Sequence, residues 1–411
     1  MPWKEESRMS LREEFVVLAS CEGANLSELC RRFGVSRKSG YKWLARYRER
    51  GISGLADESR RPRRSPDRTS EAMEVRVLEL RLQHPAWGGR KLRHRLMALG
   101  VEGVPSASTI TAILRRHGQL DASRGAGETR DHVRFEHASP NDLWQMDFKG
   151  HFALTRGGRC HPLTVLDDHS RYSIGLRACG DERRETVQDE LIGMFRVHGM
   201  PRRMLMDNGA PWGDEGGQPW TRLTAWLLRL GVGVSHGRPY HPQTQGKDER
   251  FHRTLQAEVL RERSLLDLRE CQGAFDPFRR VYNTERPHEA LGLAVPASRY
   301  RVSERSYPER LPAVEYGPDR AVRRVQTDGR IKFRGWMVRV GKAFAGEDVG
   351  VRGTPEEGVF EVNYCSESLG RFDVREGTRD ETLRLERRSR ERDERTGNTD
   401  TGSVTYVSER L

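Results

Sequence analysis

Residues 140–263 carry the pattern that most constrains the fold, because strand and helix periods follow one another there. The segment NDLWQMDFKG alternates, with Trp144 and Met146 on one face and Asp147 on the other. CHPLTVLDD and YSIGLRACG are two further strand candidates. The segments that follow are a helix over 183–199, the strand RRMLMDNG, the helix TRLTAWLLRLG, the strand GVSH and a helix over 244–263. Three strands followed by alternating helices and strands predict an α/β fold.

The N-terminal region predicts a pair of short helices joined by a tight turn. After a first helix, SLREEFVVLASCEG, the segment NLSELCRRFGVSRKSGYKWLARYRER reads as helix, break and helix. Gly34 can end one helix and Ser36 can cap the next. Tyr41, Leu44 and Ala45 are predicted to share an apolar face of the second helix. This is the helix-turn-helix layout.

Positive charge is concentrated on this pair of helices. Residues 26–50 hold eight Lys and Arg against two Glu, and the whole chain has 72 Lys and Arg against 60 Asp and Glu, a net charge of +12. Such a balance favours a polyanionic partner, although a solvated helical hairpin would show it too. The candidate DNA contacts on the second helix are Arg37, Lys38, Lys42 and Arg46.

A proline-interrupted arginine run follows, and it fits either a solvated linker or a segment that tracks phosphates. Its candidate DNA contacts are Arg60, Arg61, Arg63 and Arg64. The predicted segments are a helix-turn-helix module (1–55), a basic linker (56–69), a second helical DNA-binding module (70–118), a linker (119–138), an α/β core (139–305), a small β-barrel-like domain (320–375) and a charged tail expected to be disordered (376–411).

Three carboxylates stand out by position. Asp147 lies in the middle of a predicted strand, Asp207 closes the strand MLMDNG, and Glu249 lies in the first turns of the helix after RPYHPQTQGKDERFH. Taken alone, Asp207 is typical of an Asp-Asn-Gly turn, and Glu249 is typical of a solvated residue in the first turn of a helix. Asp147 is less ordinary, because strands disfavour Asp.

Taken together, this region resembles a known family. The motifs LWQMDFKG, LDDHSRY, MDNGAP, RPYHPQTQGKDERFHRTL and YNTERPHEALG occur in order over about 160 residues. They are similar to the retroviral-integrase-type core of bacterial insertion-sequence transposases, the Asp-Asp-Glu group. The resemblance implies a ribonuclease-H-like core over 139–305, in which Asp147, Asp207 and Glu249 converge. It also implies two Mg²⁺ ions, replaceable by Mn²⁺, with Asp147 bridging both, Asp207 holding one and Glu249 the other.

The implied function is that of a DNA transposase. The helical modules would bind the terminal inverted repeats of an insertion sequence, and the core would cleave at the element ends and join the 3′-OH ends to target DNA. Lys247 and Arg253, on either side of Glu249, are expected as further DNA contacts. Because two ends must be held together, we expect a homodimer or a larger assembly on DNA, in the bacterial cytoplasm at the nucleoid.

Some features depart from the family pattern. Between Asp207 and Glu249 lie 41 residues, more than the 35 common in the family, and the surplus falls in GDEGGQPW. Asp214 and Glu215 are therefore additional acidic candidates. Asp248 adjoins Glu249 but points about 100° away on a helix, so Glu249 is preferred.

Two histidines, His241 and His252, also flank Glu249. For both, packing or a phosphate contact is favoured over metal ligation.

Other classes of protein are disfavoured. No run of about 18 apolar residues is present, and the charged N-terminus lacks the apolar core of a signal peptide. The six cysteines form no C-x-x-C pair, which argues against a disulfide framework and for a reduced, intracellular compartment. Tyr406 lacks the motif of a tyrosine recombinase. The alternative that stays open is a helix-turn-helix DNA-binding regulator with an inactive core.

Overall fold

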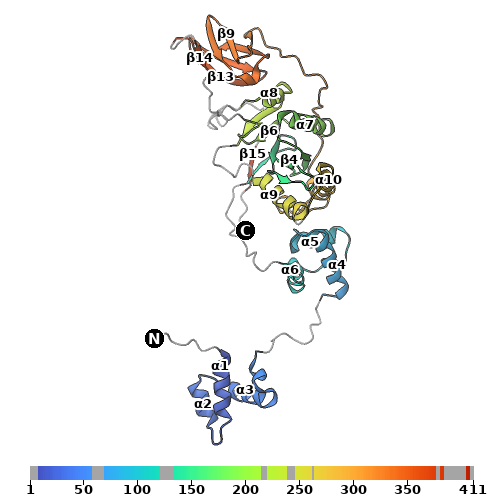
Figure 1. The fold of residues 1–411 in the computed structure, drawn as a ribbon, viewed down its shortest axis with the longest axis vertical. Helices are drawn as coiled ribbons and strands as arrows, with labels where there is room; N and C mark the ends of the chain where they lie inside the picture. The colour runs from blue at the N-terminus through green and yellow to red at the C-terminus, as the bar shows by residue number, and fades with distance from the viewer. Residues whose placement is uncertain are drawn as a thin grey trace. The chain divides into compact units, whose positions relative to one another are not determined.

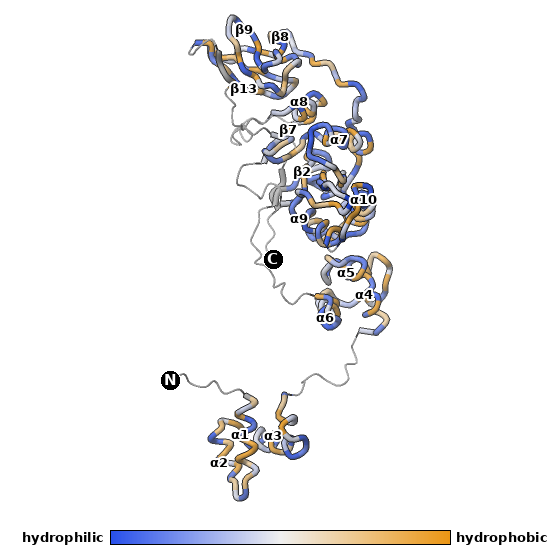
Figure 2. The backbone as a smooth tube through the Cα atoms, viewed as in Figure 1, coloured by the Kyte–Doolittle hydropathy of each residue, from blue (hydrophilic) through white to orange (hydrophobic). Residues whose placement is uncertain are grey.

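The structure, a computed structural model, describes residues 8–57, 69–120, 134–213, 220–237, 246–261, 263–375, 380–383 and 404–407. The chain forms two compact units, Met1–Arg68 and Thr69–Leu411, and each is described by itself. Hydrophilic and hydrophobic residues alternate along the helices and strands (Figure 2). Within the described ranges, no helix combines the length and the apolar character needed to cross a membrane.

The first unit is a small helical domain (Figure 1). It consists of α1 (Arg8–Ala19), α2 (Leu26–Arg32), α3 (Arg37–Arg50) and the 3-10 turn η1 (Gly51–Leu55). Gly34 has a φ of 62° in the turn after α2, and the Ser36 hydroxyl accepts a hydrogen bond from the Ser39 amide at 3.1 Å. The predicted helix-turn-helix is confirmed: Gly34 ends α2 and Ser36 caps α3, as expected.

The apolar face predicted for α3 is wrong in part. Leu44 is buried, but Tyr41 is 62% exposed and Ala45 is exposed. The buried stripe runs through Gly40 instead, where an added Cβ would lie 2.5 Å from the Cys30 sulfur. The missing side chain thus lets α3 approach α2 closely, and this turns Tyr41 toward solvent.

The second unit begins with three short helices. They are α4 (Glu71–Gln83), α5 (Gly89–Ala98) and α6 (Ala107–Arg116), as predicted for 70–118. They enclose a core that includes Leu92, Ile110 and the fully buried Trp87. The Trp87 indole donates to Glu258 at 3.1 Å, which links the helices to the following domain.

A mixed sheet forms the centre of that domain (Figure 1). Its strands are β2 (Leu143–Phe148), β3 (Phe152–Ala153), β4 (Arg159–Asp167), β5 (Ser173–Cys179), β6 (Arg203–Met206) and β7 (Gly233–His236). The order is β5-β4-β2-β6-β7, with β3 also on β4. Strand β4 runs antiparallel to β2 and β5, whereas β2, β6 and β7 are parallel. This is the predicted ribonuclease-H-like arrangement.

Helices cover both faces of the sheet. Helices α7 (Arg184–His198) and α8 (Arg222–Arg229) share a buried cluster with Trp144 and Met146 of β2. On the other face, α9 (Gly246–Leu255), the π-helical turn η3 (Gln256–Leu260) and α10 (Leu268–Thr284) share a cluster with Leu166 and Leu176. The alternation predicted for β2 is therefore confirmed, and it turns Asp147 toward the α9 side. Two 3-10 turns, η4 (Glu289–Leu291) and η5 (Pro296–Ser298), follow.

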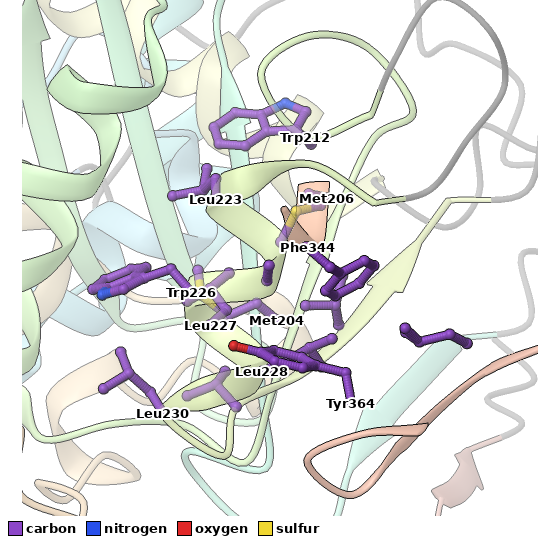
Figure 3. Close-up of a cluster of buried hydrophobic side chains, with 14 of the residues drawn as sticks. Met204, Met206, Trp212, Leu223, Trp226, Leu227, Leu228, Leu230, Phe344 and Tyr364 are labelled. Atoms are coloured by element: carbon purple, nitrogen blue, oxygen red, sulfur yellow. The ribbon is translucent and has the colours of Figure 1, made fainter. Parts of the chain in front are cut away.

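The C-terminal domain is all-β, as expected. Its elements are β8 (Ala321–Arg324), β9 (Arg330–Phe333), β10 (Trp336–Arg339), η6 (Lys342–Phe344), β11 (Asp348–Gly353), β12 (Val359–Tyr364) and β13 (Glu367–Asp373). They form a four-stranded sheet, β13-β12-β11-β8, and a smaller sheet around β10 and β9. Phe344 and Tyr364 from this domain pack in one buried cluster with Met206 and Leu227 of the core (Figure 3).

Two expectations about connecting segments need correction. Strand β14 (Asp380–Thr382) pairs in parallel with β10, and Leu383 is only 8% exposed, so the tail over 376–411 is not wholly disordered. Strand β15 (Val404–Val407) pairs with β1 (Arg134–His137), which lies within the predicted linker over 119–138. Backbone pairing needs few apolar side chains, and composition alone did not reveal it. Most of both linkers lies outside the described residues.

Candidate active site

Asp147 and Asp207 lie side by side because of the register of two parallel strands. Gln145 of β2 is paired with Leu205 of β6, and each aspartate stands two residues further along its strand direction. Asp207 directly follows β6, and its carboxylate accepts a hydrogen bond from the Gly209 amide at 3.0 Å. The sheet thus brings together two carboxylates that are 60 positions apart in the sequence.

The proximity of these carboxylates perturbs their protonation. Burial raises the pKa of Asp147 to about 7, with further contributions from the charges of Asp207, Glu182 and Glu249. Burial also raises the pKa of Asp207, against the opposing effect of the Gly209 hydrogen bond. Like charges in a partly desolvated place disfavour ionisation, and a cation bound between them would relieve this.

Glu182 is a member of this acidic group that the sequence analysis missed. It precedes α7, and its charge raises the pKa of both Asp147 and Asp207. Its carboxylate lies 2.8 Å from His161 Nδ1. The surrounding letters, GDERRE, are typical of a solvated loop, so the sequence contains no signal that marks this residue.

Helix α9 presents its two acidic residues on different sides. Asp248 is completely buried, and neither of its carboxylate oxygens has a hydrogen-bond partner within the part of the chain that the structure describes. Its pKa is raised well above the usual range, first by burial and then by the charge of Asp147. Glu249 is exposed, although its charge still acts on Asp147. As expected, the side chains of Asp248 and Glu249 point in different directions. The one that faces the interior of the protein, however, is Asp248 and not Glu249.

The donor set suits a hard divalent cation. No group of three or more His, Cys, Asp or Glu side chains within the described ranges lies close enough to hold a metal ion as it stands. The adjacent aspartates with raised pKa values nevertheless offer oxygen ligands and unbalanced negative charge, which Mg²⁺ prefers. The carboxylates of Asp147, Asp207 and Glu249 are therefore suitable ligands for such an ion. In the structure, Glu249 lies apart from the two aspartates.

His252 lies one turn after Glu249 and packs against the site. Its Nδ1 is 4.0 Å from an Asp147 carboxylate oxygen, and its Nε2 is 2.9 Å from the Thr164 hydroxyl. Burial lowers the pKa of His252 to about 4. A neutral, packed imidazole agrees with the packing role favoured from the sequence. His241 lies outside the described residues.

Lys247 does not point outward as a phosphate contact would. Its ammonium forms an ion pair with Asp168, and the two side chains are 19% and 3% exposed. The prediction of a DNA contact at Lys247 therefore needs correction, because its charge is already paired inside the protein. Arg253, on the same helix, is exposed.

The basic residues of α3 are mostly open to solvent. Arg37, Lys38 and Lys42 are exposed, and Arg46 is half-buried. The Arg46 guanidinium lies 5.2 Å from the centre of the Trp43 ring, which Lys42 and Arg12 also approach, at 4.7 and 4.0 Å. The exposed Tyr41 lies one helical turn after Arg37 and Lys38 and is a candidate DNA contact that the sequence analysis assigned to the core. The candidates that lie outside the described residues are Arg60, Arg61, Arg63, Arg64, Asp214 and Glu215.

Five protein-family models match segments of the chain. The matching families are a helix-turn-helix domain (residues 11–63), a homeodomain-like domain (39–114), two integrase core domains (137–242 and 230–296) and the C-terminal domain of IS481 family transposases (320–380). The two integrase matches span the sheet and α9, and therefore all three predicted carboxylates.

Two relatives of the chain are insertion-element proteins. The chain is 26% identical to an uncharacterized 39.2 kDa protein of insertion element IS476 from Xanthomonas euvesicatoria, over 67% of this chain and 78% of the relative. It is also 26% identical to an uncharacterized 31.7 kDa protein of IS407 from Burkholderia multivorans, over 56% and 82%. A solved simian T-cell lymphotropic virus intasome chain covers 72% of this chain and 96% of its own length, at 12% identity and a TM-score of 0.38.

Proposed function

Because the chain belongs to the insertion-sequence transposases with a retroviral-integrase-type core, we propose that it cleaves DNA at the ends of its element and joins the 3′-OH ends to target DNA. The observation that carries the proposal is the pair Asp147 and Asp207 on adjacent parallel strands, with α9 and its acidic residues on the same side. We propose Asp147, Asp207 and Glu249 as the catalytic carboxylates.

We propose that these three carboxylates hold two Mg²⁺ ions, which Mn²⁺ can replace. Bound there, the ions would neutralise the charge that develops on the attacking and leaving oxygens during in-line displacement at phosphorus. The contribution of the protein is to hold Asp147 and Asp207 in register and to desolvate them. Burial of Asp147 strengthens its attraction for a cation, because a partly dehydrated carboxylate has less water to lose.

Binding of the terminal inverted repeats is assigned to the helical modules. The exposed cations of α3 support a groove-binding role, and the arginine run at Arg60, Arg61, Arg63 and Arg64 would add phosphate contacts. Two element ends must meet for joining, so we propose that the active form is a homodimer or a larger assembly on DNA.

The experiment that tests this function is a strand-transfer assay. The DNA that flanks the gene supplies the substrate, as a labelled duplex ending in its short inverted repeat. We expect joined products with Mg²⁺ or Mn²⁺, no products in EDTA, and none from Asp147→Asn, while that variant still binds the labelled end. Full activity in EDTA would exclude the metal-dependent mechanism. End binding without joining under any metal condition would favour a DNA-binding regulator with an inactive core.

A further inference from the structure

Asp168, which directly follows β4, is a buried junction of three segments. Its side chain is almost fully buried, and both carboxylate oxygens are occupied. One oxygen accepts a hydrogen bond from the His137 amide at 2.9 Å. The other accepts from Gln145 Nε2 at 2.7 Å and pairs with the Lys247 ammonium. The carboxylate therefore connects β2, β4 and the first turn of α9.

Two of these partners lie close in the sequence to proposed catalytic residues. Gln145 stands two residues before Asp147 on β2, on the same face of the strand. Lys247 stands two residues before Glu249 on α9. A single carboxylate thus holds both the strand that carries the first catalytic residue and the helix that carries the third.

We infer that the Asp168–Lys247 ion pair is a positioning device, which fixes the first turn of α9 against β2, beside the proposed metal ligand Asp147. The inference rests on the proposed function. Lys247 is then a positioning residue and not a phosphate contact. Neither member of the pair touches the reacting atoms; each acts through the element that it holds.

Burial gives the pair its strength as a positioning device. Removing one partner of a buried ion pair leaves the other as an uncompensated charge, so the element that carries it tends to move toward water. Loss of Lys247 would release the start of α9, and loss of Asp168 would in addition free Gln145. Among the described residues, the side chain of the adjacent Asp248 has no hydrogen-bond partner, whereas Lys247 is bound to Asp168.

The test compares Lys247→Met, Lys247→Arg, Asp168→Asn and the double variant Lys247→Met/Asp168→Asn in the full chain. Lys332→Met, an exposed lysine of β9, is the matched control. Three quantities are measured for each folded variant: Mn²⁺ affinity by calorimetric titration, joining rate against Mg²⁺ concentration, and the salt dependence of element-end binding. Thermal unfolding establishes which variants are folded.

We expect Lys247→Met to lose about 10- to 100-fold in Mn²⁺ affinity, with a joining rate that partly recovers at high Mg²⁺. Lys247→Arg should recover most of the affinity, because it keeps the charge. If Lys247→Met does not fold, the double variant, which leaves no unpaired charge, is the one measured and should show the same loss. End binding and its salt dependence should match those of Lys332→Met.

Two results would overturn the inference. One is a folded Lys247→Met or double variant with the Mn²⁺ affinity and Mg²⁺ dependence of the wild type. The other is a salt slope that falls by about one unit in Lys247→Met, as a lost phosphate contact would give. The calorimetric readout also separates this inference from the proposed function. A wild-type protein that binds Mn²⁺ through Asp147 but never joins DNA would refute the function, while the role of the ion pair would still be decided by affinity.

Discussion

Helices α3 and α9 both carry basic residues in their first turn, yet they use them in opposite ways. Arg37 and Lys38 of α3 are exposed, whereas Lys247 of α9 is paired with a buried aspartate. Among the described residues, α3 packs against α1, α2 and the turn η1, and this leaves Arg37 and Lys38 in contact with water. Helix α9 begins against the end of strand β4, where Asp168 presents its carboxylate. The role of a lysine in this protein is therefore set by what covers its helix face, and the residue type alone does not reveal it.

The largest expected effect concerns the acidic residues of α9. Glu249→Gln should lower the joining rate by at least ~10²-fold, about 2.7 kcal/mol of activation free energy, while end binding stays at the wild-type level. Asp248→Asn should lose little, because Asp248 has a strongly raised pKa and an amide resembles its neutral form. Joining rates of the two variants on one substrate provide the measurement.

The same comparison has two informative failures. An inactive Asp248→Asn beside an active Glu249→Gln would make the buried residue the ligand. An active Glu249→Gln beside an inactive Asp214→Asn or Glu215→Gln would move the third carboxylate to the segment between Asp207 and α9. Either result leaves the class of reaction intact.

The next largest effect concerns the stability that Mg²⁺ adds to the folded protein, which should depend on pH. The pKa of Asp147 is raised from 3.8 to about 7 in the folded chain, so the folded state binds this proton more tightly than the unfolded state. Stability of the metal-free protein should therefore fall as pH rises through this window, and Mg²⁺ should restore more of it at high pH. Thermal unfolding with and without Mg²⁺, at about pH 5 and about pH 8, measures this. An equal effect of Mg²⁺ at both values, unchanged by Asp147→Asn, would contradict it.

A smaller effect is expected on the DNA-binding side. Tyr41 is exposed on α3, one helical turn after Arg37 and Lys38, where an aromatic ring can contact base edges. Tyr41→Ala should reduce the preference for the element end over unrelated DNA by about 10-fold, with an unchanged salt slope. Competition binding with both DNAs provides the measurement. A proportional loss on both DNAs would instead indicate that Tyr41 stabilises the fold or contacts phosphate.

The smallest effect sets the two lysines of the comparison directly against each other. Lys42→Ala should lower the slope of log K against log salt by about one unit, since an exposed lysine that neutralises a phosphate displaces one counterion. Lys247→Met should leave the slope as it is. If both variants change the slope equally, the difference between α3 and α9 proposed here is wrong.

The sequence was informative wherever the deciding interactions are local. The cap at Ser36 binds an amide three residues away, and the alternation of β2 follows from one buried face. The site formed by Asp147, Asp207 and Glu249 was suggested by the resemblance of the motifs around them to the integrase-type core. The cap and the strand alternation are each contained in about ten residues of chain.

The direction of single side chains could not be predicted in the same way. Lys247 turns inward because of Asp168, a partner 79 positions away in the sequence. Tyr41 turns outward because Gly40 lets α3 pack closely on Cys30. Asp248 and Glu249 are adjacent acidic residues, and only the packing of α9 on the sheet decides which one is buried. Each outcome depends on tertiary contacts that a periodic pattern does not encode.

Strand β14 has a practical consequence for anyone who shortens this protein. A chain that ends at residue 375 keeps β8 to β13 but leaves one edge of β10 without its parallel neighbour and removes the buried Leu383. Unpaired strand edges next to an apolar surface are prone to pair with other molecules, so such a fragment is expected to self-associate and precipitate. Extending the chain through residue 383 restores β14 and Leu383, so this edge of β10 is paired again.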